Sequence, residues 1–213
     1  MPGGTDQSSP SDRTGQRRLS AGERRAQLIT VALRLFSERG FRATTMDDVA
    51  DAAGVTKPLV YQHFSSKRAL YLELVDRVAK ELVAQIASAV RGADGPRQQV
   101  ERGFAAFFHM VVTHEDAFLL LYGRNEADPD LDEAQRRVES AIAEAIGPLI
   151  NAGLDDDHRR FLAYAVVGMA EGASRHWVAT RGEQRRTPNA EAARLGQRLA
   201  DLAWAGLRSV HAD

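Results

Sequence analysis

The 213-residue sequence contains no cysteine, and no apolar run approaches the roughly 20 residues that a membrane-spanning helix needs. Without cysteine the chain can form no disulfide and no thiolate site, which favours a cytoplasmic location. The N-terminal residues lack the apolar core of a secretory signal. The composition, 44% hydrophobic and 27% charged, is typical of a globular protein that buries a core.

Signals of catalysis and of metal binding are also missing. The sequence has no glycine-rich phosphate loop and no nucleophile elbow. His109 and His114 lie five residues apart, which is the wrong spacing for one face of a helix, and no cysteine could join them as a ligand. We therefore expect no enzymatic activity, no metal site and no cofactor.

Strand patterns are missing too, whereas apolar residues recur at helical spacing along most of the chain. The sequence predicts an all-α fold. A three-helix N-terminal unit is expected to be joined by a long helix, from Lys67 to about Arg91, to a helical C-terminal domain. Residues 1–19 are rich in Gly, Pro, Ser and Gln and predict a disordered tail. The first domain is expected at 20–82 and the second at 83–213.

The most informative stretch is residues 44–67. Thr45 is placed to cap a short helix, with Asp48 three residues later in the pattern of a capping box. Gly54 follows this helix, where a Cβ would either crowd a close helix crossing or strain a positive φ. Thr56 is placed to cap a second short helix. Two short helices joined by a tight turn are the layout of a helix-turn-helix, whose second helix enters the major groove of DNA.

The charge is distributed unevenly along the chain. Residues 1–68 hold 11 Lys and Arg against 7 Asp and Glu, a net of +4, whereas residues 69–213 hold 17 against 22, a net of −5. The positive charge thus lies on the segment with the helix-turn-helix motif, at about residues 45–64. This is the sign that attraction to phosphate requires.

Polar side chains occupy positions on the second short helix that suit DNA binding. Thr56 and Lys57 stand at its start, Tyr61 and His63 stand further along, and Lys67 opens the next helix as a phosphate anchor. The alternative is an ordinary helical hairpin with a solvated face. Because the caps, the turn and the polar face agree over the whole stretch, we favour DNA binding.

These residues also resemble a known family. Over roughly residues 22–82 the sequence is similar to the DNA-binding domain of the TetR family of bacterial transcriptional regulators. The similarity is carried by Gly40-Phe41, Thr44-Thr45, Val49-Ala50, Ala53-Gly54-Val55, and Tyr61-Gln62-His63-Phe64 before Ser66-Lys67.

The resemblance implies contacts with operator DNA by Thr45, Thr56, Lys57, Pro58, Tyr61, His63 and Lys67. Thr45 and Lys67 would sit on the DNA backbone. Thr56, Lys57 and Pro58 would face bases, and Tyr61 and His63 could do either. The resemblance further implies a homodimer on a palindromic operator, a C-terminal domain that binds a small-molecule effector and, most often, repression.

The last two helices are candidates for the dimer surface. Small residues allow close approach of another helix, and an aliphatic stripe would pack across a two-fold axis into a four-helix bundle. The residues concerned are Gly168, Gly172, Leu195, Leu199, Leu202 and Gly206. The alternative is that the same residues fill the core of one subunit. We favour dimerisation because two half-sites need two reading helices.

An aromatic group in the second domain is a candidate pocket lining, with polar residues after it for a ligand head group. The candidates are Phe104, Phe107, Phe108, Phe118, Tyr122, Arg124, Asn125, Tyr164 and Met169. The alternative is a solid core in a DNA-binding dimer that is controlled by its abundance or by a protein partner. The runs 57–67 and 203–207 are similar to actinobacterial regulators of lipid metabolism that sense acyl-CoA, which would imply a long apolar or amphipathic effector.

Overall fold

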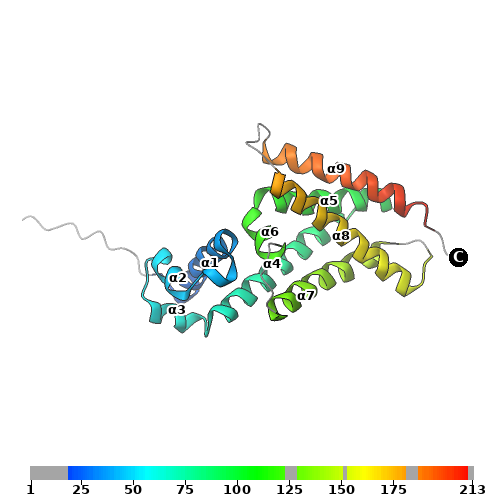
Figure 1. The fold of residues 1–213 in the computed structure, drawn as a ribbon. Helices are drawn as coiled ribbons and strands as arrows, with labels where there is room; N and C mark the ends of the chain where they lie inside the picture. Colours follow the sequence, from blue (N-terminus) through cyan, green and yellow to red (C-terminus); the bar gives the residue numbers. More distant parts are fainter. Residues whose placement is uncertain (1–18, 123–128, 151–152, 181–186, 211–213) are drawn as a thin grey trace, which may run out of the picture.

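The computed structural model describes residues 19–122, 129–150, 153–180 and 187–210. In this part of the chain every regular element is helical, which confirms the all-α prediction (Figure 1). Nearly all of the predicted N-terminal tail, together with Arg124 and Asn125, lies outside the described residues.

Helix α1 (Ala21–Ala43) begins at a capping box between Ser20 and Glu23. Its regular part ends at Gly40, whose φ of 77° only glycine adopts readily. The chain then turns so that Thr44, which is fully buried, donates its hydroxyl to the carbonyls of Gly40 at 2.9 Å and Leu35 at 3.2 Å. These bonds satisfy carbonyls that the end of the helix leaves unpaired.

Helices α2 (Met46–Ala53) and α3 (Lys57–His63) form the predicted helix-turn-helix. Gly54 between them has the left-handed φ of 65°, and a Cβ added there would meet no atom within 4 Å. Of the two reasons for glycine at this turn, the backbone angle therefore applies and crowding does not. The helices pack on α1 and on the next helix through fully buried side chains such as Leu28, Val49 and Val60.

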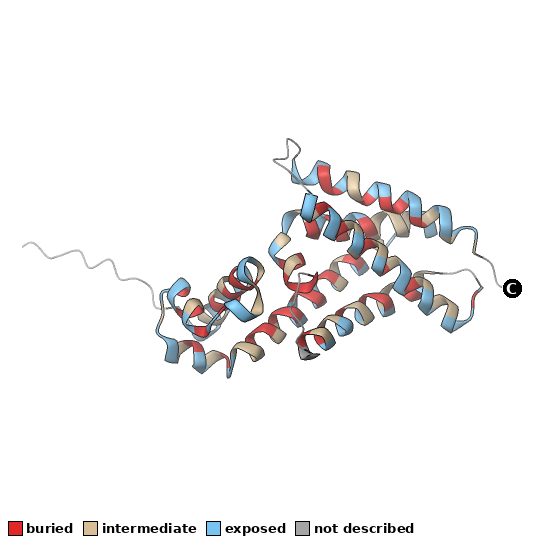
Figure 2. Cartoon of the chain, viewed as in Figure 1, coloured by how far each residue is buried: buried red, intermediate tan, exposed pale blue. Residues whose placement is uncertain are grey.

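Helix α4 (Lys67–Val90) connects this unit to the rest of the molecule (Figure 1). The remaining elements are α5 (Pro96–Thr113), α6 (Glu115–Tyr122), α7 (Pro129–Ile146), the 3₁₀ turn η1 (Gly147–Leu149), α8 (Asp156–Thr180) and α9 (Pro188–Leu207). Figure 2 shows buried residues along α4, α5 and the inward faces of the helices around them. The core therefore continues from the N-terminal unit into the bundle through α4.

Helices α5 and α9 lie antiparallel and very close together. Arg97 reaches Asp201 at 3.8 Å near one end, and Gly196 faces Ala105 further along. A Cβ on Gly196 would stand 3.1 Å from the Ala105 Cα, which is tighter than side chains normally allow. Gly196 thus permits a close approach of two helices within one subunit, whereas a Cβ on Gly168 or Gly172 would meet no atom of the same subunit within 4 Å.

None of the described helices is by itself long and apolar enough to cross a membrane. The apolar stretch formed by α5 and α6 together is bent by 101° between the two helices.

Candidate functional site

One face of α3 is buried and the other is open to solvent. Val60 is fully buried on the inner side, whereas Thr56, Lys57 and Pro58 are exposed and Tyr61 keeps 45% of its surface exposed. Thr56 occupies the N-cap position but its side chain makes no capping hydrogen bond, so its hydroxyl is left for an external partner. His63, at the C-terminal end, is half-buried.

An ion pair on the protein surface engages Lys57. Its ammonium lies 2.9 Å from one carboxylate oxygen of Asp47 and 3.1 Å from the other, and both side chains are more than half exposed. Hydrogen bonding to Asp47 raises the pKa of Lys57. Lys57 must therefore exchange this carboxylate for a DNA group if it binds DNA. This competition could not be predicted from the sequence, because Asp47 belongs to the preceding helix.

Thr45 lies at the exposed start of α2, where it forms the predicted capping box. The Asp48 amide donates to the Thr45 hydroxyl at 3.1 Å, and the Thr45 amide donates to the Asp48 carboxylate at 2.7 Å. The Thr45 hydroxyl also donates to the Asp48 carboxylate, and this bond together with that from the Thr45 amide, with a smaller effect of Arg39, lowers the pKa of the Asp48 carboxyl group. The cap fixes the direction in which the Thr45 end of α2 points.

Lys67 is placed differently from a free phosphate anchor. Its ammonium donates to the carbonyl of Phe41 at 2.7 Å and of Arg42 at 3.3 Å, and it lies 4.4 Å from the centre of the Phe41 ring. Burial lowers the pKa of this ammonium. Lys67 thus caps carbonyls at the end of α1 and ties α1 to the start of α4.

Two residues that sequence reasoning missed hold the end of α3 in place. Arg25 of α1 forms a bidentate ion pair with Glu73 of α4, with Nη2 2.6 Å from Oε2, and its guanidinium stacks 4.6 Å from the centre of the Phe64 ring. The pair raises the pKa of Arg25 and lowers that of Glu73. Together these contacts connect α1, the end of α3 and α4. A helix-turn-helix whose second helix, α3, is held by these contacts and exposes its outer face is typical of a DNA-binding protein.

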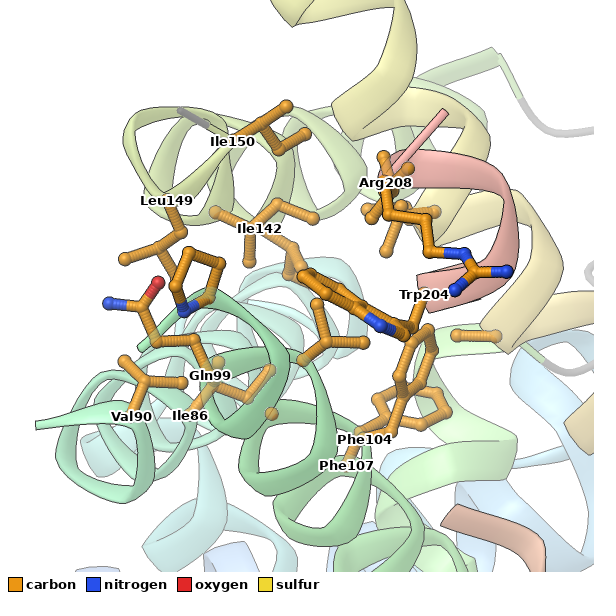
Figure 3. A pocket seen from close by; sticks show the side chains of 18 of the residues that line it. Ile86, Val90, Gln99, Phe104, Phe107, Ile142, Leu149, Ile150, Trp204 and Arg208 are labelled. Atoms are coloured by element: carbon orange, nitrogen blue, oxygen red, sulfur yellow. The ribbon is translucent and has the colours of Figure 1, made fainter. Parts of the chain in front are cut away.

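A cavity of about 330 Å³ lies inside the helical bundle, between α4, α5, α7, α8 and α9 (Figure 3). Its lining is almost entirely apolar. Ile86, Phe104, Phe107, Ile142 and Trp204 are among the side chains that face it. A cavity with such a lining suits an apolar ligand or the apolar part of a larger one.

The structure brings three of the predicted pocket residues to this cavity: Phe104, Phe107 and Tyr122. Phe108 and Phe118 are each 1% exposed and, like the half-buried Met169, lie outside the lining. Tyr164 also lies outside it, on the solvent-facing side of α8. Trp204 and Leu207 of α9, and Arg208 just after it, line the cavity and were missed. Their spacing of three and four residues at the end of α9 was the available signal.

Charged residues on α7 and α8 surround the Tyr122 hydroxyl. Burial raises its pKa well above the usual range, and the carboxylates of Glu171 and Glu139 raise it further. Burial, followed by the charge of Glu171, also raises the pKa of Glu139. Arg175 holds Glu171 with contacts of 2.5 and 2.9 Å. Tyr122 therefore remains a neutral phenol at the end of the cavity.

Helix α6 connects the cavity to the helix-turn-helix. Tyr122 at its end lines the cavity, and two residues earlier the Leu120 carbonyl accepts a buried hydrogen bond of 3.1 Å from the Tyr71 hydroxyl. The Tyr71 ring packs edge-on against Phe36 at 5.2 Å and Phe41 at 5.1 Å between ring centres. Tyr71 thus contacts α6 with its hydroxyl and α1 with its ring.

The residues predicted for the dimer surface have two environments. Gly168, Gly172 and Gly206 are exposed, and Leu202 keeps 61% of its surface exposed. Leu199 is buried in the core of the subunit, and Leu195 packs against that core. Phe161, 70% exposed on α8, extends the exposed apolar surface and was not predicted.

Comparison with known proteins agrees with this description. The family described as "Bacterial regulatory proteins, tetR family" matches residues 28–74. The chain is 31% identical over 219 residues to the HTH-type transcriptional activator FasR of Mycolicibacterium smegmatis, covering 97% of each chain. The chain therefore belongs to the tetR family, and it is a DNA-binding transcriptional regulator. The resemblance seen in the sequence is confirmed.

Solved structures show the same fold. The TetR-like transcriptional regulator from Rhodococcus sp. RHA1 has a TM-score of 0.72 and 26% identity, covering 91% of this chain and 100% of that one. The regulator FadR from Bacillus subtilis, solved in complex with stearoyl-CoA, has a TM-score of 0.66 at 13% identity, covering 82% of this chain and 97% of that one.

Proposed function

We propose that this regulator binds a palindromic operator as a homodimer and is released from it by a small apolar or amphipathic effector. The observation that carries the proposal is the apolar cavity of about 330 Å³ in the bundle. A regulator with a closed core, controlled by its abundance or by a protein partner, has no use for such a cavity. A ligand that fills the cavity removes apolar surface from water, which contributes a favourable free energy of about 25 cal/mol per Å² buried.

We assign recognition of the operator sequence to the exposed face of α3. Thr56, Lys57 and Pro58 face bases, and Tyr61 and His63 contact bases or phosphates. Thr45 contacts the DNA backbone from the start of α2. Lys67 contributes at the same surface, although its ammonium is already bonded to two carbonyls.

The dimer is assigned to the outer faces of α8 and α9. The exposed Gly168, Gly172, Leu202 and Gly206, with Phe161 beside them, form an apolar face that a second copy would cover. An isologous contact of two helices from each subunit makes a four-helix bundle and presents two α3 helices to successive major grooves. Leu195 and Leu199 support this face from within the subunit.

For the effector, a long acyl chain fits the lining. The FadR structure of the same fold contains stearoyl-CoA, and the runs 57–67 and 203–207 are similar to regulators that sense acyl-CoA. An acyl chain gains about 0.8 kcal/mol for each methylene that the cavity buries. A fatty acyl thioester is therefore the first ligand to test.

Whether the protein represses or activates transcription depends on where the operator lies. Bound over a promoter, the dimer acts as a repressor, which is the mode we propose. Activation is the second candidate, because the relative FasR, similar over nearly the whole chain, is named as an activator. Transcription in vitro from a promoter with its operator separates the two modes. Added protein would lower the transcript level in the first mode and raise it in the second.

The proposal is tested by selecting binding sites from fragmented genomic DNA and then titrating the selected DNA with effector candidates. We expect a palindromic site and a loss of affinity of about 5–150-fold when the effector is present, the usual range for coupled sites. Acyl-CoAs of increasing chain length form the first panel. Binding of an acyl chain without any change in DNA affinity would contradict the proposal.

A further inference from the structure

The cavity in the bundle has a buried end and an exposed end. Tyr122 and Phe107 at one end are 1% and 5% exposed. At the other end, Pro96 at the start of α5 and Arg208 just after α9 are exposed, and Ile150 just after η1 is half-buried. From Gln99 to Phe107, α5 rises about 12 Å at 1.5 Å per residue, which sets the depth of the apolar part. The opening thus lies where α5 begins and where η1 and α9 end.

Arg208 is the only charged residue among the described residues that line the cavity. Its side chain makes no hydrogen bond and no ion pair with any described residue. Figure 3 shows it beside the Trp204 indole, at the rim. No acidic side chain lines the cavity in the described part of the chain, so nothing at the opening competes for the guanidinium.

We infer that Arg208 binds the anionic head group of the effector, whose apolar chain points inward toward Phe107 and Tyr122. This inference rests on the proposed function, because it assigns the orientation of the effector in the same cavity and the residue that contacts its head group. The guanidinium presents a fixed fork of donors that matches a carboxylate or a phosphate. Gln99 also lines the cavity, on the opposite side from Arg208 in Figure 3.

The opposite orientation, with the head group inward, is disfavoured by the chemistry of the buried end. Tyr122 could donate one hydrogen bond there. Burial raises the pKa of its hydroxyl, and the carboxylates of Glu171 and Glu139 raise it further and would repel a second anion. Arg175, whose charge also acts on Tyr122, is already bonded to Glu171, and a buried anion without a free cationic partner is costly. At the rim the same anion keeps contact with water as well as with Arg208.

The test compares probes with one chain length and different head groups. Isothermal titration calorimetry measures the Kd of the full-length protein for decanoate, decyl phosphate and 1-decanol. We expect Arg208→Ala to weaken both anions about tenfold, the value of roughly one charge-assisted hydrogen bond, and to leave 1-decanol unchanged. Arg208→Lys, which keeps the positive charge, should recover part of the loss. Arg198→Ala, which removes an exposed arginine of α9 outside the lining, is the matched control.

Two further readouts separate an electrostatic role from a structural one. Added NaCl should weaken the binding of the anions to the wild type and leave 1-decanol unaffected. Lengthening the chain should improve the Kd by about fourfold per methylene until the buried end is reached. A larger effect of Arg208→Ala on decyl phosphate than on decanoate would assign the site to a phosphate-bearing head, and the reverse to a free carboxylate.

The outcomes distinguish this inference from the proposed function. If Arg208→Ala weakens the binding of 1-decanol and decanoate equally, or weakens the binding of no probe, the role of Arg208 is overturned, whatever happens to DNA binding. Loss confined to the anions supports it. If that loss is found while no probe alters operator affinity, the head-group assignment stands and the effector-release proposal fails.

Discussion

At the scale of single residues, the DNA-facing surface carries a carboxylate that opposes DNA binding. Asp47 pairs with Lys57 in the free protein. We predict that Asp47→Asn strengthens binding to DNA of any sequence, because it removes a negative charge and frees Lys57. Lys57→Ala should weaken binding to the operator and relax the sequence preference, because Lys57 is assigned to a base edge.

Fluorescence anisotropy with labelled operator and scrambled DNA, titrated over NaCl, measures both effects. Asp76→Asn, which removes an exposed carboxylate from an ion pair with Lys80 on α4, is the control. If Asp47→Asn and Asp76→Asn have the same effect on affinity, the ion pair with Lys57 has no part in DNA binding.

Lys67 is predicted to serve stability as well as DNA binding. Removing its ammonium leaves the Phe41 carbonyl without its 2.7 Å partner, so Lys67→Ala should lower the free energy of unfolding by about 1 kcal/mol. Lys80→Ala, which removes a surface ion pair, should change it by less than about 0.5 kcal/mol. Urea unfolding gives both values. Unchanged stability with weakened operator binding would leave Lys67 as a DNA anchor alone.

These residues show which parts of the site the sequence could predict. Thr45 and Asp48 are three residues apart, so their capping box is a local pattern that can be seen directly. The carbonyl partners of Lys67 lie about 25 residues earlier in the chain, and Arg25 is 48 residues from Glu73. No local pattern encodes such distant contacts, so their roles depend on the folded structure.

At the scale of elements, α7 and α8 bring the half-buried carboxyl groups of Glu139 and Glu171 near enough for their charges to interact. Burial raises the pKa of Glu139, so its carboxyl group binds a proton more readily in the folded protein than in the unfolded chain. The contribution of Glu139 to the free energy of unfolding therefore falls as pH rises from the unfolded pKa, about 4.3, through the folded one.

We predict that Glu139→Gln removes this fall and stabilises the protein at neutral pH, by on the order of 0.5 kcal/mol after solvent screening. Urea unfolding at several pH values from about 4 to about 7 measures it. Glu144→Gln, an exposed position on the same helix, serves as control. A parallel pH dependence of wild type and Glu139→Gln would rule out this assignment.

The elements themselves were largely predictable, because caps, glycines and helical spacing are local signals. Which aromatic residues line the cavity was not predictable. Phe104, Phe107 and Phe108 share one side of α5, yet only the first two face the cavity. The difference arises from where α7 and α9 pack, and α9 is positioned on α5 by the contact between Gly196 and Ala105. That contact joins residues about 90 positions apart.

At the scale of the whole molecule, the proposed dimer depends on an apolar face that one subunit leaves open. Leu202→Glu places a charge on this face while changing little in the subunit core, because the side chain is 61% exposed. We predict a folded monomer at concentrations where the wild type is a dimer, measured by analytical ultracentrifugation. Ala84→Glu on the exposed side of α4 should remain dimeric. A dimeric Leu202→Glu protein would place the interface elsewhere.

Tyr71 is the residue through which ligand binding is expected to reach the helix-turn-helix. Its ring belongs to the packing of α1, and its hydroxyl bonds to the Leu120 carbonyl on the helix that ends at the cavity. A ligand that displaces Tyr122 must therefore move the bond partner of Tyr71. Helix α4, which carries Tyr71 and begins next to α3, would pass that movement on.

We predict that Tyr71→Phe keeps the fold and operator affinity but weakens the coupling between effector and operator. The ring contacts with Phe36 and Phe41 remain, and the hydrogen bond to the Leu120 carbonyl, worth about 1 kcal/mol, is lost. The factor by which the effector weakens operator binding should fall about fivefold. Because coupling is reciprocal, operator DNA should weaken effector binding by the same reduced factor, which gives a second measurement of one quantity. Tyr164→Phe, which removes an exposed hydroxyl on α8, is the control. Full coupling in Tyr71→Phe would show that α4 transmits the signal without this hydrogen bond.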